Sequence, residues 1–390
     1  MIICYGLVPF AGALVRRYKW FSFRRCFDEL RLHPLLDYCS FWRQDKTGVP
    51  EIYRFTGVFE SVTDGQTLWI RSNDLTVPVS LKNAKSYILL AQKDEHLDEA
   101  PPEKIRWEKV STLTEGARVF VGGPLEHLNG RRTFVSLKEN PLIIIFYDGS
   151  DNTLTNRVIR SGRWQGEYLN SITPYSLAIG ALCQILMALN YQSRIAYRLT
   201  VIVSLIALFI PLYPIIPPGL LFTLMYRRLS GRARALRAYG DIARLPLRYL
   251  TAQKGTPKSA GPLRECCSLP GGESYGYVRY QQLPPEVREK KIPFLLPRSS
   301  KVASGDSWYV FGALQEEQAP GSQVFEPAVV KPQDPFATFG ILPGNPGTLA
   351  RRYTVRAYLT ETVAWIFLLV GIGINILFVR TILALLGVTF

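Results

Sequence analysis

Long apolar runs alternate along the chain with stretches in which polar and apolar residues are mixed. Four runs stand out, at residues 2–15, 172–191, 199–226 and 363–390. A helix needs about 20 apolar residues to cross a hydrocarbon core of ~30 Å, because each residue advances it by about 1.5 Å. The last three runs reach this length, so the pattern predicts three membrane spans, or four if the shorter N-terminal anchor also crosses the membrane.

Clusters of arginine border these runs. They follow the first and third runs and precede the second and fourth, whereas the short link between the second and third holds only Arg194 and Arg198. Because Lys and Arg accumulate in the cytoplasmic flanks of spans, one topology places every rich cluster in the cytoplasm and both termini outside. We therefore expect a multi-pass protein of a bacterial inner membrane, with both soluble stretches cytoplasmic.

Two of the basic stretches are also amphipathic. Between residues 19 and 32, Trp20, Phe23, Phe27 and Leu30 fall on one helical face, and residues 226–245 form a second such pattern. Basic amphipathic helices bind anionic lipid headgroups, which are the first partners we expect. The expected membrane-surface residues are Arg16, Arg17, Arg24, Arg25, Arg227, Arg228, Arg232, Arg234 and Arg237.

The first soluble stretch shows the short-period alternation of β-structure. Asn129-Gly130 between two apolar segments is a strong hairpin signal. The continuous apolar run 142–147 is typical of a buried strand. An acidic, proline-containing segment at 92–106 is expected to be an exposed loop. The predicted strands are 53–62, 68–70, 76–81, 118–122, 133–137 and 142–147.

The second soluble stretch repeats this order, with predicted strands at 275–280, 308–314, 328–331 and 336–342. Residues 115–122 resemble 305–312, and Asn140-Pro141-Leu142 resembles Asp334-Pro335-Phe336. Thr153-Leu154 with Arg157 likewise resembles Thr348-Leu349 with Arg352, and an apolar run follows each set. The pattern predicts an internal duplication of a small β-domain followed by a membrane helix; chance likeness of two turn-rich segments is the alternative.

A strand ending in Gly, a hairpin, Pro before an apolar strand and a linker into a membrane helix together resemble the GIDE (BAM) domain. The resemblance covers roughly residues 55–165 and 273–355, without the RING that some members carry. It implies a membrane-tethered β-rich interaction module and supplies no catalytic residue. A five-stranded OB-like barrel fits the same strand count. The expected fold class is thus membrane helices plus two small GIDE-like or OB-like domains.

These observations divide the chain into seven parts. They are an anchor (1–15), a basic amphipathic juxtamembrane segment (16–50), a first β-rich domain (51–168), a transmembrane hairpin (172–226), a basic helix and linker (227–272), a second β-rich domain (273–358) and a C-terminal span (362–390).

Prolines interrupt the third span at Pro211, Pro214, Pro217 and Pro218, where an α-helix must lose backbone hydrogen bonds. Transporters use such breaks at binding sites, whereas a proline-rich turn at the membrane interface is the structural alternative. The polar residues expected within spans are Gln184, Asn375 and Arg380. The first two could bond between helices, and Arg380 could reach the interface.

Composition narrows the possible chemistry. The formal charge of +15 permits nucleic acid, membrane or acidic partners, but the basic residues lie beside the spans, so we expect no nucleic acid. Six cysteines without a C-x-x-C pair and only three histidines favour no metal site. We expect no cofactor.

Three side chains are candidates for catalysis. Asp148 and Asp151 could act as paired carboxylates and His127 as a base, although a polar turn explains each of them as well. We therefore assign no catalytic residue. The favoured hypothesis is a non-enzymatic membrane scaffold or assembly protein that binds a protein partner, or a second copy of itself, through its β-domains. A transporter or channel component using the broken span, and a membrane-bound hydrolase, are the alternatives.

Overall fold

The protein is a mixed helix-and-sheet chain with two separate sheets. The computed structural model describes residues 3–42, 50–64, 66–72, 75–89, 103–105, 116–128, 130–163, 166–168, 170–191, 201–202, 204–205, 217, 219–251, 265–282, 292–296, 308–318 and 325–385. The chain forms two compact units. The helical unit comprises Met1–Phe21, Gly162–Arg237 and Tyr353–Phe390, and the β unit comprises Ser22–Ser161 and Ala238–Arg352.

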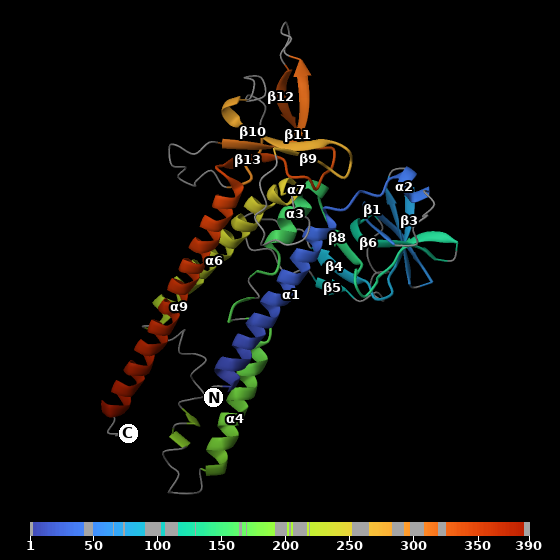
Figure 1. Ribbon diagram of the computed structural model, residues 1–390. Helices are drawn as coiled ribbons and strands as arrows, with labels where there is room; N and C mark the ends of the chain where they lie inside the picture. Colours follow the sequence, from blue (N-terminus) through green and yellow to red (C-terminus); the bar gives the residue numbers. More distant parts are fainter. Residues whose placement is uncertain are drawn as a thin grey trace. The chain divides into compact units, whose positions relative to one another are not determined.

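The helices of the helical unit pack in two pairs. A π-helical turn, η1 (Ile3–Leu7), leads into α1 (Val8–Leu30), which lies against α4 (Thr173–Tyr191) (Figure 1). The Ser176 hydroxyl donates to the Cys4 carbonyl at 2.6 Å, and Gly180 makes room for the Tyr5 ring. The small residues at positions 176 and 180 therefore permit close approach of the two helices.

The second pair is α6 (Gly219–Arg244) and α9 (Pro346–Leu385). Tyr226 stacks obliquely on Trp365, with ring centroids 5.8 Å apart, and both belong to a small apolar cluster with Ala364 and Leu368. A Cβ at Gly371 would lie 2.7 Å from Cβ of Phe222, so glycine is needed for this contact. The boundaries between the two units fall inside three helices, after Phe21 in α1, after Arg237 in α6 and before Tyr353 in α9. Each of these helices therefore contributes residues to both units.

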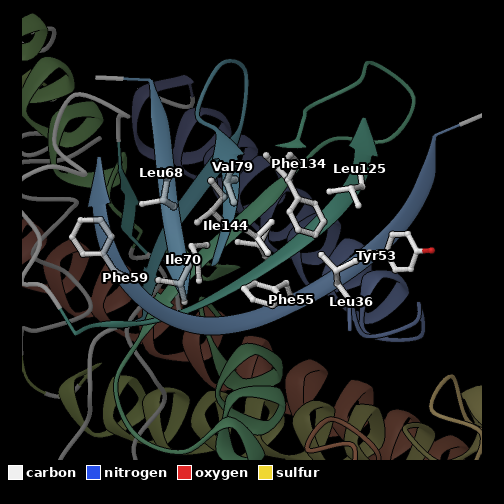
Figure 2. Packing of buried hydrophobic residues seen from close by; sticks show 14 of the residues in the cluster. Leu36, Tyr53, Phe55, Phe59, Leu68, Ile70, Val79, Leu125, Phe134 and Ile144 are labelled. Atoms are coloured by element: carbon white, nitrogen blue, oxygen red, sulfur yellow. The ribbon is translucent and has the colours of Figure 1, made fainter. Parts of the chain in front are cut away.

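Five strands of the β unit close into a barrel. The order is β1 (Glu51–Thr63), β2 (Thr67–Ser72), β3 (Leu75–Ser80), β7 (Arg131–Phe134) and β6 (Arg118–Leu128), and β6 pairs back to β1. Consecutive hairpins join β1 to β3, and the chain then returns to place β6 beside β1, which is a Greek key. Apolar side chains from all five strands fill its interior, as Figure 2 shows.

Strand β6 belongs to two layers. Its second half pairs with β7 in the barrel, and its first half pairs with β8 (Ile143–Tyr147). Beyond β8 follow β4 (Lys85–Leu89) and β5 (Glu103–Ile105), and the short α2 (Tyr38–Trp42) and α3 (Asp151–Arg160) complete this part. The change of partner falls at Gly122-Gly123, where a Cβ would meet Leu30 at 3.0 Å and Leu142 at 2.7 Å.

The second sheet has the order β12 (Phe325–Val330), β11 (Trp308–Gln318), β10 (Ser274–Arg279) and β9 (Cys266–Ser268), and β13 (Gly340–Pro343) also pairs with β11. The short helices η6 (Tyr280–Gln282) and α7 (Leu247–Leu250) lie in the same unit. Strand β11 uses its first half for β13, its second half for β12 and its other edge for β10. Strand β6 uses β8, β7 and β1 in the same way.

Most of the predicted strands are confirmed. The Asn129-Gly130 hairpin joins β6 to β7, with Leu128 opposite Arg131, and β8 is buried throughout. Two predictions are wrong. Glu103–Ile105, expected to lie in a loop, pairs with β4, and the strand expected from Phe336 starts at Gly340. The reason for the second is local: the Asp334 carboxylate accepts from the Phe336 amide at 3.0 Å and holds a turn.

Candidate functional site

The helical unit changes from apolar to charged at one place in each helix. The apolar run of α1 ends at Arg16, that of α6 gives way to Arg227, and that of α9 is preceded by Glu361. Side chains from these changeover points meet in a cluster, which we call the charged junction. Its members are Arg17, Arg163, Glu167, Ser230, Arg234, Arg237, Tyr358 and Glu361.

Glu361 ties three helices together. One carboxylate oxygen lies 3.6 Å from Nη1 of Arg17 on α1, and the other pairs with Arg237 on α6. The Arg237 guanidinium also lies over the ring of Tyr358, 5.9 Å from its centroid. A single carboxylate on α9 therefore faces two cations from different helices.

Glu167 makes the second link of the junction. It pairs with Arg234 and accepts a hydrogen bond from the Ser230 hydroxyl, both on α6. Its neighbour Gly166 lies beside α1, because a Cβ at Gly166 would be 3.5 Å from Cβ of Arg17. The segment that precedes α4 is thereby held between α1 and α6.

The junction carries more positive than negative charge. Burial, and then the neighbouring cations Arg17, Arg163 and Arg234, lower the pKa of Arg237 to about 10. Glu361 and Glu167 balance only part of this charge. Such an arrangement of guanidinium groups can hold an anion.

The expected membrane-surface residues lie in three kinds of surroundings. Arg17, Arg234 and Arg237 make the ion pairs of the junction, whereas Arg227, Arg228 and Arg232 are exposed on α6, and Arg16 is half-buried. Arg25 pairs with Glu29 one helical turn away, and Arg24 donates to the Ser161 carbonyl at 2.8 Å.

The apolar face predicted to lie on lipid between residues 19 and 32 is instead buried in protein. Phe27 contacts Phe120 with ring centroids 5.1 Å apart, Phe23 contacts Tyr87 at 4.5 Å, and Leu30 covers Gly122. Trp20, in the helical unit, lies against Gly162. The lipid interpretation of this face was wrong because helical periodicity marks a buried face without saying what buries it.

Asn375 is one of the three polar residues predicted within spans, and it does bond between helices. Its side-chain oxygen accepts from the amide of Gly219 at 3.0 Å, and it is almost fully buried. Gln184 is also buried, and Arg380 is exposed. Of the four helix-break prolines, Pro217 lies in a turn just before α6, and Pro211, Pro214 and Pro218 lie outside the described residues.

The three catalytic candidates do not come together in any contact among the described residues. Asp151 begins α3, pairs with Arg118 and accepts from the Tyr147 hydroxyl at 2.8 Å. Burial and this carboxylate raise the pKa of Tyr147, so the phenol remains a donor. Asp148 is exposed directly after β8, and His127 is exposed near the end of β6.

Sequence reasoning missed a buried ionic cluster in the β unit. Arg54 on β1 forms a two-pronged pair with Asp334, one arm at 2.8 Å, and lies over the ring of Phe336. Arg31 donates to the Phe336 and Leu245 carbonyls, at 3.2 and 3.4 Å. Both arginines are at most 1% exposed. The Asp-Pro-Phe motif was the only signal for this cluster, and it was interpreted only as a repeat.

Asp28 joins the same buried cluster. It pairs with Arg31 at 3.3 Å and with Arg248 at 3.1 Å. Burial nevertheless raises the pKa of the Asp28 carboxyl, against the effect of both cations. The cluster links distant segments of the chain inside one unit, which is a structural role.

The described residues contain no group of three or more His, Cys, Asp and Glu side chains that could hold a metal ion, and all six cysteines are free. Two helices, α4 and α9 from Pro346 to Thr381, each contain an apolar stretch long enough to cross a membrane, which is weak evidence for membrane association. No family model, curated protein or solved structure matches the chain. The resemblance to the GIDE domain stays a prediction.

Proposed function

We propose that the protein is a multi-pass, non-enzymatic scaffold of a bacterial inner membrane, whose β-modules bind a protein partner or a second copy of the chain in the cytoplasm. The observation that carries this proposal is the distribution of exposed apolar side chains on the helical unit. They lie along four helical segments, and in each segment they give way to the charged junction.

The exposed apolar surface supports burial of all four segments in lipid. Besides α4 and α9, η1 exposes Ile3 and Leu7, the beginning of α1 exposes Phe10, and the beginning of α6 exposes Leu221 and Leu224. Soluble proteins rarely expose apolar patches of this extent. The one-sided meeting of the charged ends agrees with a topology in which every arginine cluster lies on the cytoplasmic side.

The two β-modules are proposed to be an internal duplication of an OB-like barrel unit. Supporting this, β1, β6, β7, β8 and α3 correspond in pairing and order to β10, β11, β12, β13 and α9. The helix starts also agree in detail. The hydroxyls of Thr153 and Thr348, each third in its helix, donate to the Ser150 and Asn345 carbonyls at 2.8 and 2.9 Å.

A role without catalysis fits the side chains that were tested as candidates. Asp151, at the start of α3, pairs with Arg118 and accepts a hydrogen bond from Tyr147. Asp148 and His127 are exposed to solvent and make no contact with Asp151 among the described residues. The Asn375 bond to Gly219 supplies a protein partner for the backbone where α6 begins. This favours an anchor over a transport pathway at that position.

Thiol labelling tests the membrane placement. Single-cysteine variants that retain Cys183 on α4 or Cys266 on β9, both exposed, are treated with a membrane-impermeant maleimide in vesicles of either orientation. Cys266 should react only in inverted vesicles, and Cys183 only after solubilisation. Release of the protein by alkaline carbonate, or labelling of Cys266 from the outside, would contradict the proposal.

Cross-linking in intact membranes, followed by purification in detergent, tests the scaffold role. A stoichiometric partner or a homodimer is expected. Recovery of the monomer alone under conditions that cross-link a known membrane complex would count against it.

A further inference from the structure

The charged junction has features of a ligand site that ion pairing within the protein does not explain. Arg17 and Arg237 both pair with one carboxylate, that of Glu361, and Glu167 is engaged by Arg234. This leaves an excess of positive charge at Glu361, and burial, followed by the neighbouring cations, lowers the pKa of Arg237. A partly buried site of this kind is stabilised by an added anion.

The junction is open on the side of α1. The Arg17 side chain is 40% exposed although it pairs with Glu361. On the same face of α1, Leu14, Tyr18 and Phe21 are exposed as well, at 50%, 75% and 55%. Aromatic residues at such positions are typical of the headgroup level of a bilayer.

An exposed apolar surface also adjoins the junction on α9. Val363 and Ile366 are 41% and 53% exposed, directly after Glu361 on the apolar side of the junction. A free inorganic anion would make no use of these apolar faces, whereas the acyl chains of a lipid would cover them. Arginine is suited to the anion itself, because its planar guanidinium donates two parallel hydrogen bonds to a phosphate.

We propose that the charged junction binds the phosphate of an anionic phospholipid, with the exposed Arg17 as the reachable donor and Arg237, which shares Glu361 with it, behind it. This inference rests on the proposed placement of the helical unit in a membrane. It goes further by assigning one bound lipid to a defined set of side chains, distinct from the exposed arginines of α6.

The test uses the full chain in nonionic detergent with phosphatidylglycerol or phosphatidylcholine, and native mass spectrometry counts the lipids retained. Arg17→Gln is expected to weaken retention of phosphatidylglycerol about fivefold, since one arginine near the surface contributes about 1 kcal/mol. Arg232→Gln, which removes the same charge from an exposed position on α6, is the matched control and should leave retention unchanged.

A second variant gives an effect of opposite sign. Glu361→Gln removes a carboxylate that competes for Arg17 and Arg237, so retention should rise, whereas a purely structural role of the junction predicts no gain. Equal retention by the wild type, Arg17→Gln and Arg232→Gln would overturn the inference. So would equal retention of both lipids.

The source of the anion is tested separately. Inorganic phosphate is titrated against lipid-free protein while thermal unfolding is followed. Saturation by phosphate that Arg17→Gln abolishes, without retention of phosphatidylglycerol, would overturn the lipid assignment. Failure of the protein to enter vesicles would instead contradict the proposed function, so the two failures are distinguishable.

Discussion

The side-chain oxygen of Asn375 accepts a hydrogen bond from the backbone amide of Gly219, the first residue of α6, across 3.0 Å. The first amides of a helix have no partner within the helix, and a lipid environment supplies none. The side chain of Asn375 on α9 therefore provides an acceptor for the first backbone amide of α6, directly after a proline-rich segment of the sequence.

Replacing Asn375 by Leu should destabilise the protein by about 1–2 kcal/mol, because the Gly219 amide loses its acceptor. Denaturant unfolding in detergent measures this difference. Phe378→Leu, at an exposed position one turn further along α9, is the control and should have little effect. Equal stability of the two variants would show that the amide finds another partner.

Breaking the pair between Arg54 and Asp334 should be far more costly. Arg54→Met leaves the carboxylate of Asp334, itself 9% exposed, without its cation, and about 3–5 kcal/mol should be lost. The exposed pair of Arg71 and Glu60 offers the control in the same barrel: Arg71→Met should cost less than about 1 kcal/mol. Similar losses in both variants would contradict the importance of burial.

The raised pKa of Asp28 predicts a specific pH dependence. The folded state holds the proton more tightly than the unfolded state, whose carboxyl titrates near the ordinary 3.8. The free energy of unfolding should therefore fall as pH rises from that value through the raised pKa, and then level off. Asp28→Asn should remove this slope.

Unfolding curves of wild type and Asp28→Asn over this pH range give the comparison. Glu29→Gln, at an exposed neighbouring position, serves as the control for a change of surface charge. If the wild type instead gained stability relative to Asp28→Asn as the pH rises, the attraction of Arg31 and Arg248 for the carboxylate would outweigh the effect of burial.

Gly162 and Gly130 form a matched pair of left-handed residues, with φ of 69° and 77°. Alanine at Gly130 meets open space and should cost only the conformational penalty of about 1–2 kcal/mol. Alanine at Gly162 would also place its Cβ 2.7 Å from Cγ of Trp20, so it should cost clearly more. Thermal unfolding of both variants checks the order, and equal losses would show that Trp20 moves aside freely.

The sequence predicted local structure well where one signal decided it. Asn129-Gly130 specified a hairpin, and the run 142–147 specified a buried strand, because turn chemistry and unbroken apolarity have few alternatives. The length of α4 and of the apolar part of α9 was equally readable. These features depend on residues that are neighbours in the chain.

Contacts between distant residues were not predictable. Arg54 and Asp334 are 280 positions apart, and nothing in either local sequence indicates that the two would meet. The prediction that the apolar face with Phe27 lies on lipid was wrong for a related reason, because lipid and a β-sheet favour the same apolar side chains. The charged junction was predicted only in part, because its arginines were identified from the sequence but the carboxylates of Glu167 and Glu361 were not.

Strand β6 is shared between the barrel and the layer of β8, β4 and β5, and this limits which sequence changes the strand can accept. Side chains alternate along a strand, so a one-residue insertion reverses every following position. Near Gly123, such an insertion would turn the barrel half of β6 inside out while leaving the half beside β8 intact. This part of the chain should therefore vary by substitution and hardly ever in length, in contrast to the loops around it.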